Sequence, residues 1–138
     1  MSDRNRILCE FRNKTKSIMG DSLKQMILYG SYARGDYGDN SDMDIMVLTD
    51  DRIIQIEDEI FDVAYDIELE YGVPISVNIK NEKHFKNWVN SLPYYSNIQK
   101  EGIIIASKEE AQKQFDNAES IVAAIIEYMR KNNSGTII

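Results

Sequence analysis

Two short apolar runs, separated by a loop of small and acidic residues, constrain the fold of this 138-residue chain most strongly. Met26–Tyr29 is apolar and stops at Gly30, and Asp44–Thr49 is almost entirely apolar after its first residue. Runs of this length that are bounded by turn residues are typical of buried strands. A nearly all-apolar strand is typical of a sheet that helices cover, so we expect a layered domain around these two strands.

Helical periodicity surrounds the two runs. Residues 4–19 carry apolar side chains at helical spacing and close at Gly20, and residues 51–71 do the same before Gly72. Shorter elements are expected as a strand at Val73–Ile79, a helix over 82–91 that Pro93 ends, and a strand at Gly102–Ala106. The alternation of helices and strands predicts an α/β (α+β) fold with a small mixed sheet flanked by helices.

The C-terminal segment predicts one more helix. Apolar residues recur there at helical spacing: Phe115, Ala118, Ile121, Val122, Ile125, Tyr128 and Met129. We therefore expect a main domain over residues 1–106 and a helical extension over 107–138. The extension should pack on the same domain or on a partner, which leaves a homo-oligomer open.

Composition narrows the class of protein. The net charge of −7 argues against binding to an extended nucleic acid, because such binding depends on many Lys and Arg contacts to phosphate. Cys9 is the only cysteine and His84 the only histidine, which excludes intramolecular disulfides and disfavours a Cys/His zinc site, so any metal would be held by oxygen. We expect Cys9 to be a buried thiol and His84 a surface helix residue. No apolar run approaches a membrane span and no apolar signal core opens the chain, so a cytoplasmic location is expected.

An Asp-x-Asp pair precedes the second apolar run. Side chains at i and i+2 of a strand point to the same face, with about 6.5–7 Å between their Cα atoms. Asp42 and Asp44 can therefore converge on one ion. Mg²⁺ takes one or two carboxylates and completes its octahedron with water and substrate phosphates. The expected ligand is a nucleoside triphosphate with Mg²⁺.

The turn after the first run suits phosphate. Gly30 lets the backbone approach a ligand closely, and Ser31 can cap the following helix or turn and offer its hydroxyl and amide to a phosphate. Arg34, one helical turn later, can donate to a phosphate oxygen. It can equally form a salt bridge to Asp36 or Asp39, and the sequence does not separate these two roles.

The spacing of these motifs resembles a known family. Gly30-Ser31, ten intervening residues and Asp42-x-Asp44 resemble the signature of the DNA polymerase β-like nucleotidyltransferases. The fuller run Gly-Ser-Tyr-Ala-Arg-Gly from Gly30, with Ser41-Asp42-Met43-Asp44-Ile45, is more specifically similar to the minimal nucleotidyltransferases of bacteria and archaea. The resemblance is specific over Tyr29–Leu48 and extends loosely over residues 1–105 by the order of elements.

The resemblance implies a nucleotidyltransferase fold and a reaction. Gly30, Ser31, Arg34 and Ser41 would bind the nucleotide, and Asp42 and Asp44 would be the catalytic pair that holds two Mg²⁺ ions. A nucleoside monophosphate, AMP from ATP, would pass to an acceptor hydroxyl with release of pyrophosphate. Members often pair with a HEPN-type protein in toxin–antitoxin modules and modify a tyrosine of that partner with AMP.

One feature departs from the family pattern. Active members place a third carboxylate on the next strand, where Val73–Ile79 offers only Ser76 or Asn78. Neither side chain can act as an anionic base. Glu68 and Glu70 are the nearest acids in sequence, and they are expected as solvated charges on the preceding helix.

Three hypotheses follow for the function. The chain is an active nucleotidyltransferase, a catalytically weak nucleotide-binding module that acts by binding a partner, or a scaffold domain that binds no nucleotide. Tyr32 and Tyr37 flank the predicted site, where they can stack on a base, although covering the edge of the core is the favoured role. Tyr94 and Tyr95, after Pro93, are a candidate contact patch.

Overall fold

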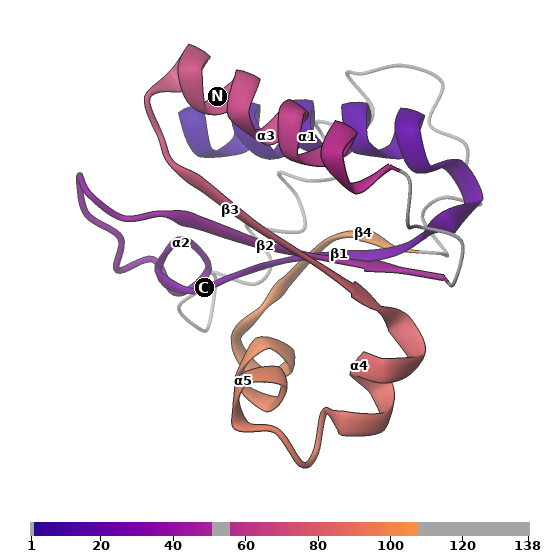
Figure 1. The fold of residues 1–138 in the computed structure, drawn as a ribbon. Helices are drawn as coiled ribbons and strands as arrows, with labels where there is room; N and C mark the ends of the chain where they lie inside the picture. The colour runs from indigo at the N-terminus through magenta and orange to yellow at the C-terminus, as the bar shows by residue number, and fades with distance from the viewer. Residues whose placement is uncertain (1, 51–55, 108–138) are drawn as a thin grey trace.

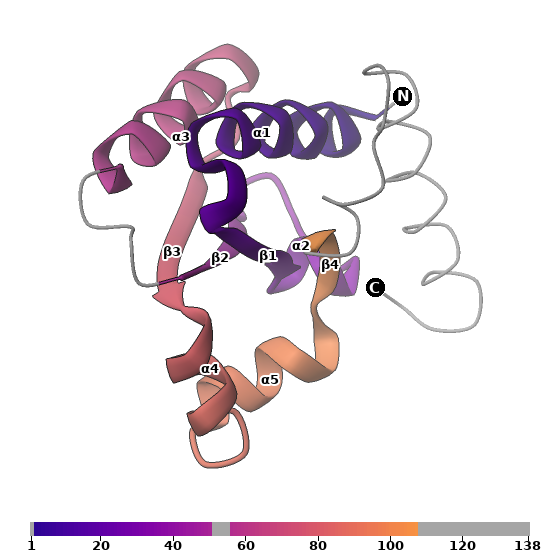
Figure 2. The ribbon, with the colours of Figure 1, turned by 90° about the vertical axis from the view of Figure 1, so that its right-hand side faces the viewer.

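A computed structural model describes residues 2–50 and 56–107 and places a four-stranded sheet between two pairs of helices (Figure 1). The elements run α1 (Asp3–Met19), the 3-10 turn η1 (Gly20–Ser22), β1 (Leu23–Tyr29), α2 (Ser31–Arg34), β2 (Met43–Thr49), α3 (Glu57–Tyr71), β3 (Ile75–Asn81), α4 (Glu82–Trp88), α5 (Pro93–Glu101) and β4 (Ile103–Ser107). Helices α1 and α3 lie side by side over one face of the sheet, and α4 and α5 lie on the other (Figure 2). The predicted α/β class with a mixed sheet is confirmed.

The sheet has the strand order β3-β2-β1-β4. Strand β1 pairs antiparallel with both β2 and β4, whereas β2 and β3 are parallel and are joined through α3. The two apolar runs are therefore the central strands, and Met26, Leu28 and Met46 are fully buried. Both strands begin earlier than predicted, at Leu23 and Met43.

The α1/α3 layer has the predicted amphipathic pattern. Ser2 caps α1 by accepting a hydrogen bond from the backbone N–H of Asn5 at 3.2 Å, and the helix ends at Gly20 with φ of 54°. In α3 the buried side chains are Ile60, Ala64 and Ile67. The predicted start of this helix, over residues 51–55, lies outside the described residues.

The α4/α5 layer differs from the prediction at Pro93. Helix α4 confirms the predicted helix, with exposed His84 on its surface. Pro93, expected only to end that segment, is the first residue of α5. Proline suits the first turn of a helix because its φ is already helical and its missing N–H would have no helical partner there. Tyr94 and Tyr95 therefore lie on a helix.

Strand β3 lies at the sheet edge and starts two residues later than predicted. Pro74 precedes it, and its carbonyl accepts a hydrogen bond from the backbone N–H of Met43 at 2.8 Å. The strand at Gly102–Ala106 is confirmed as β4. The helix expected within 107–138 falls on residues 108–138, outside the described residues. None of the described helices is long and apolar enough to cross a membrane.

Candidate active site

The residues of the predicted site meet where β1 ends and β2 begins. Tyr29 is the last residue of β1 and pairs in register with Asp44 of β2. The chain turns at Gly30 into the single-turn helix α2 and returns through the loop that carries Ser41 and Asp42. The fold therefore brings the glycine turn and the Asp-x-Asp pair to one end of the central strand pair (Figure 1).

Gly30 touches the Asp44 carboxylate in a way that only glycine allows. Its φ of 74° and ψ of −156° lie in a region that L-residues with a side chain rarely adopt. A Cβ at this position would overlap the Asp44 side chain, with Oδ2 as the nearest atom. Glycine at position 30 is therefore required for Asp44 to occupy its place in β2.

The two aspartates occupy different environments. Asp44 is half-buried in β2, whereas Asp42 is exposed one residue before the strand. Burial raises the pKa of the Asp44 carboxyl, the neighbouring Asp42 raises it further, and Arg34 partly opposes both. A divalent cation shared by these oxygens would relieve both the desolvation and the repulsion, so this donor set fits a hard ion such as Mg²⁺.

Asp44 faces the α4/α5 side of the sheet. Side chains alternate along a strand, so Asp44 shares its face with Met46 and Leu48, which pack in a cluster with α4 and α5. The α1/α3 layer covers the opposite face. The candidate site therefore lies on the α4/α5 side of the sheet.

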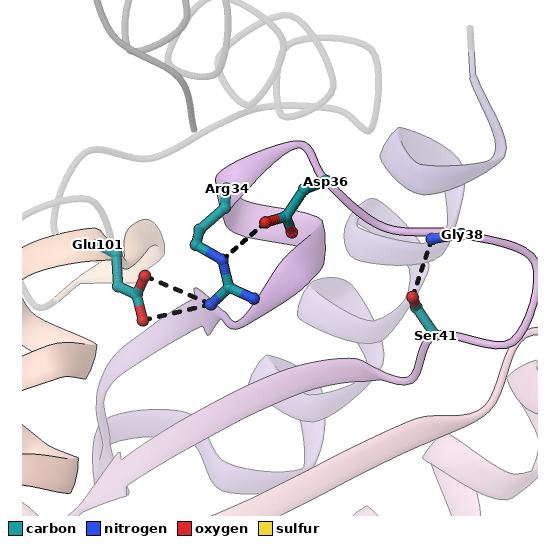
Figure 3. Close-up of polar contacts among 5 residues, drawn as sticks. All are labelled: Arg34, Asp36, Gly38, Ser41 and Glu101. Atoms are coloured by element: carbon teal, nitrogen blue, oxygen red, sulfur yellow. Dashed lines mark hydrogen bonds and ion pairs between the residues drawn. The ribbon is translucent and has the colours of Figure 1, made fainter.

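Ser31 and Ser41 both accept hydrogen bonds from backbone N–H groups of α2 and the loop after it. The cap that Ser31 could provide does not form, because Gly30 is the N-cap of α2 and no side chain caps this helix. The Ser31 carbonyl instead accepts from the backbone N–H groups of Gly35 and Asp36. Ser41 Oγ accepts a hydrogen bond from the Gly38 backbone N–H at 2.9 Å (Figure 3).

Arg34 forms ion pairs in this structure. Its Nε lies 3.2 Å from Asp36 and its Nη1 lies 3.4 Å from Glu101 of α5 (Figure 3). These two carboxylates raise the pKa of the Arg34 guanidinium. Of the two roles left open by the sequence, the structure shows the salt bridge to Asp36. Glu101 is a partner that the sequence analysis missed, since 67 residues separate it from Arg34.

A cluster of two tyrosines and one asparagine lies beside Asp44, and no local sequence pattern predicts it. The hydroxyls of Tyr29 and Tyr94 are 2.6 Å apart, and Asn78 Nδ2 donates to them at 2.8 Å and 3.2 Å. Burial and the hydrogen bond with Tyr94 raise the pKa of Tyr29, so its hydroxyl stays neutral. The three side chains come from β1, β3 and α5, so only the tertiary structure brings them together.

The strand that usually carries a third carboxylate holds polar neutral residues at this point. Ser76 pairs in register with Asp44, and Asn78 is the next residue on that face. Within residues 2–50 and 56–107, no three His, Cys, Asp or Glu side chains converge as a metal site. Glu68 is not a freely solvated charge as expected, because it accepts a hydrogen bond from the Ile75 backbone N–H at 3.0 Å.

Two further predictions concern aromatic and thiol side chains. Tyr32 and Tyr37 stack on each other with ring centroids 4.0 Å apart. Tyr32 is buried, whereas Tyr37 is 43% exposed. Cys9 is buried as expected, and burial raises the pKa of its thiol.

Comparison with known proteins decides the family. Residues 8–116 match the family described as the nucleotidyltransferase domain. The chain belongs to the nucleotidyltransferase family. Two proteins of Methanocaldococcus jannaschii, MJ0604 and MJ0141, are provisionally named protein adenylyltransferases. This nucleotidyltransferase is 35% identical to MJ0604 over 70% of its own length and 91% of that protein. It is 31% identical to MJ0141 over 64% of its own length and 91% of that protein.

A solved structure shows the same fold. The crystal structure of a variant of the toxin–antitoxin MntA-HpeT contains a chain that is similar with a TM-score of 0.50 at 14% identity. The match covers 98% of this nucleotidyltransferase and 94% of that chain. The predicted nucleotidyltransferase fold is thereby confirmed.

Proposed function

We propose that this nucleotidyltransferase transfers AMP from Mg²⁺-bound ATP to a hydroxyl of a protein, and that the acceptor is a tyrosine of a HEPN-type partner. The observation that carries the proposal is the pairing of Asp42 and Asp44 beside the Gly30 turn. One carboxylate is half-buried and the other exposed, and they repel each other electrostatically. Such a pair is costly for stability and is suited to a cation that carries a triphosphate.

Each residue of the site has a role in this proposal. The backbone at Gly30 and Ser31 lies against the triphosphate, while Ser41 fixes the loop through Gly38. Asp42 and Asp44 hold Mg²⁺, which when bound neutralises phosphate charge and orients the reacting oxygens. The acceptor oxygen forms a bond to the α-phosphorus as the bond from that phosphorus to the bridging oxygen breaks. Pyrophosphate leaves, and the proton of the acceptor hydroxyl passes to water.

Arg34 is poised to change partners. Its side chain is 43% exposed and holds two carboxylates, Asp36 and Glu101. A triphosphate offers the guanidinium more negative charge than either carboxylate, and it accepts the same fork of donors. In the proposal Arg34 therefore turns from one of its acidic partners to the phosphates when ATP binds.

The acceptor class follows from the relatives and the motif. MJ0604 and MJ0141, which this chain matches over most of their length, are named for adenylyl transfer to proteins. The Gly30–Ile45 motif is similar to that of the minimal nucleotidyltransferases, which often pair with HEPN-type proteins. Together they support a protein tyrosine as the acceptor.

A second candidate function is a nucleotide-binding module that acts by binding a partner without efficient transfer. Asn78 favours it, because this side chain occupies the face beside Asp44 where a third carboxylate would lie and donates its amide hydrogens to two tyrosine hydroxyls. An amide in this place cannot accept the proton of an acceptor hydroxyl. Nucleotide binding can survive without it.

The test measures transfer of label from α-labelled ATP to the protein encoded by the adjacent reading frame. Asp42→Asn and Asp44→Asn should each abolish labelling, because each removes a metal-binding charge. Asp39→Asn is the matched control, since Asp39 is an exposed acid of the same loop. Labelling that survives both site variants would sink the assignment.

Calorimetry separates the two candidates. Binding of Mg²⁺-ATP by the wild-type chain with no labelling of the partner would establish the binding module in place of the enzyme. Failure to bind Mg²⁺-ATP would overturn both.

A further inference from the structure

Helix α3 carries an exposed apolar row on its outer surface. Phe61, Tyr65 and Leu69 follow each other at every fourth residue and are 44%, 58% and 66% exposed. Their spacing places them along one side of the helix. Three large apolar side chains in a line are more than the single exposed residues normal on a protein surface.

The same helix holds the net charge of the whole chain. It contains seven acidic residues and no lysine or arginine. The chain has 23 acidic and 16 basic residues, so the remainder carries 16 of each and is formally neutral. The formal charge of −7 therefore resides on α3.

Helix stability does not account for these acids. Glu57, Asp58 and Glu59 in the first turn favour the helix through its dipole. Farther along, carboxylates repeat at every fourth residue and continue to the C-terminal end, where negative charge opposes the dipole. The repeated members are Asp58, Asp62, Asp66 and Glu70. The arrangement costs helix stability, and an oppositely charged surface would repay that cost.

We propose that the outer face of α3 is a docking surface for a basic protein partner, whose apolar side chains contact Phe61, Tyr65 and Leu69 and whose Lys and Arg border them. Apolar anchors one turn apart are how an exposed helix is recognised, and a partner helix can contact them with its own apolar side chains. Charge argues against a second copy, a nucleic acid and an anionic membrane as the occupant. A second copy would bring two faces of the same sign together, and nucleic acids and anionic membranes are also negative.

The docking surface is separate from the candidate active site. Helix α3 lies beside α1 on one side of the sheet (Figure 2), whereas Asp44 faces the side of α4 and α5. A partner on α3 leaves the nucleotide site open. The inference therefore stands apart from the proposed function, and it is tested without nucleotide.

The experiment uses the full chain and a model partner. The probe is a helical peptide of about 18 residues, five turns, with leucines along one face and lysines along the other. A peptide with glutamate in place of lysine is the matched negative probe. Calorimetry should show binding of the lysine peptide alone, and binding should weaken as salt rises. No binding of the lysine peptide overturns the proposal.

Variants locate the binding. The double variant Tyr65→Ser, Leu69→Ser should bind the lysine peptide at least about tenfold more weakly, since it removes two of the three apolar anchors. Trp88→Ser is the matched control, because Trp88 is 46% exposed but lies on α4, across the sheet. Unchanged binding by the double variant, or an equal loss in Trp88→Ser, refutes the location.

A charge variant and a test of self-association complete the experiment. The isosteric double variant Asp62→Asn, Asp66→Asn should weaken binding and flatten its salt dependence, and this arm decides alone if the serine variant unfolds. Sedimentation of the wild-type chain should show that α3 mediates no self-association. A dimer that Tyr65→Ser, Leu69→Ser dissociates would assign the face to a second copy and overturn the proposal.

Discussion

Replacing Gly30 by alanine tests the contact on which the candidate site depends. The added Cβ meets two obstacles. The backbone at Gly30, with φ of 74° and ψ of −156°, lies in a region almost reserved for glycine. The Cβ would also overlap the Asp44 carboxylate, so Asp44 must leave its place in β2.

The structure allows the two costs to be separated. Gly20 has a comparable backbone, with φ of 54° and ψ of −128°, but a Cβ there meets nothing within 4 Å. Gly20→Ala should therefore show the backbone cost alone, about 1–3 kcal/mol. Gly30→Ala should add about 1–3 kcal/mol for the overlap with Asp44. At 138 residues each kcal/mol lowers Tm by roughly 3 °C, so Gly30→Ala should melt about 3–9 °C below Gly20→Ala.

The assay is thermal and urea unfolding of the two variants, followed by a third protein. In Gly30→Ala, Asp44→Ala the carboxylate is gone, so the overlap cost should largely disappear while the backbone cost remains. Transfer or nucleotide binding should be lost in Gly30→Ala and kept in Gly20→Ala. Equal stability of Gly30→Ala and Gly20→Ala, or no relief from removing Asp44, would falsify the contact.

Two other predictions concern Asn78 and Cys9. Asn78→Asp places a carboxylate beside Asp44 that can accept hydrogen bonds from the Tyr29 and Tyr94 hydroxyls. Labelling of the partner should therefore rise about tenfold or more, whereas Asn78→Ala should not raise it. Equal labelling rates in the two variants would contradict a limiting third carboxylate. Burial raises the pKa of the Cys9 thiol, so the native state binds this proton more tightly than the unfolded chain does. The free energy of unfolding should therefore fall as pH rises above the thiol pKa of the unfolded chain, about 8.5. Iodoacetamide at about pH 8.5 should therefore alkylate Cys9 slowly in the native chain and rapidly in denaturant, and equal rates would show an exposed thiol.

Local patterns determined the main elements of this fold. The apolar runs of β1 and β2 predicted buried strands, and the helical repeats that end at Gly20 and Gly72 predicted α1 and most of α3. These signals depend on residues a few positions apart, which is why they can be read without a structure. Pro93 was misjudged because proline both ends one helix and begins another.

The candidate site was also predicted in part from residues that are close in sequence. Gly30, Asp42 and Asp44 were predicted together because a turn and a following strand hold them within 15 residues of sequence. Their proximity at the sheet end agrees with that prediction, while their roles in binding and catalysis stay a proposal. The capping bond that Ser31 could form is absent, and no side chain caps α2.

The order of residue types around the Gly30 turn can be read from the chain alone, because these residues are close together in sequence. Their distant neighbours come from the packing of the layers: Glu101 contacts Arg34, and the hydroxyls of Tyr29 and Tyr94 contact Asn78. The packing of α3 also leaves three of its apolar side chains exposed beside its acidic residues. The physical reason is that side-chain contacts between distant strands and helices depend on how the layers pack, and no local periodicity encodes that packing.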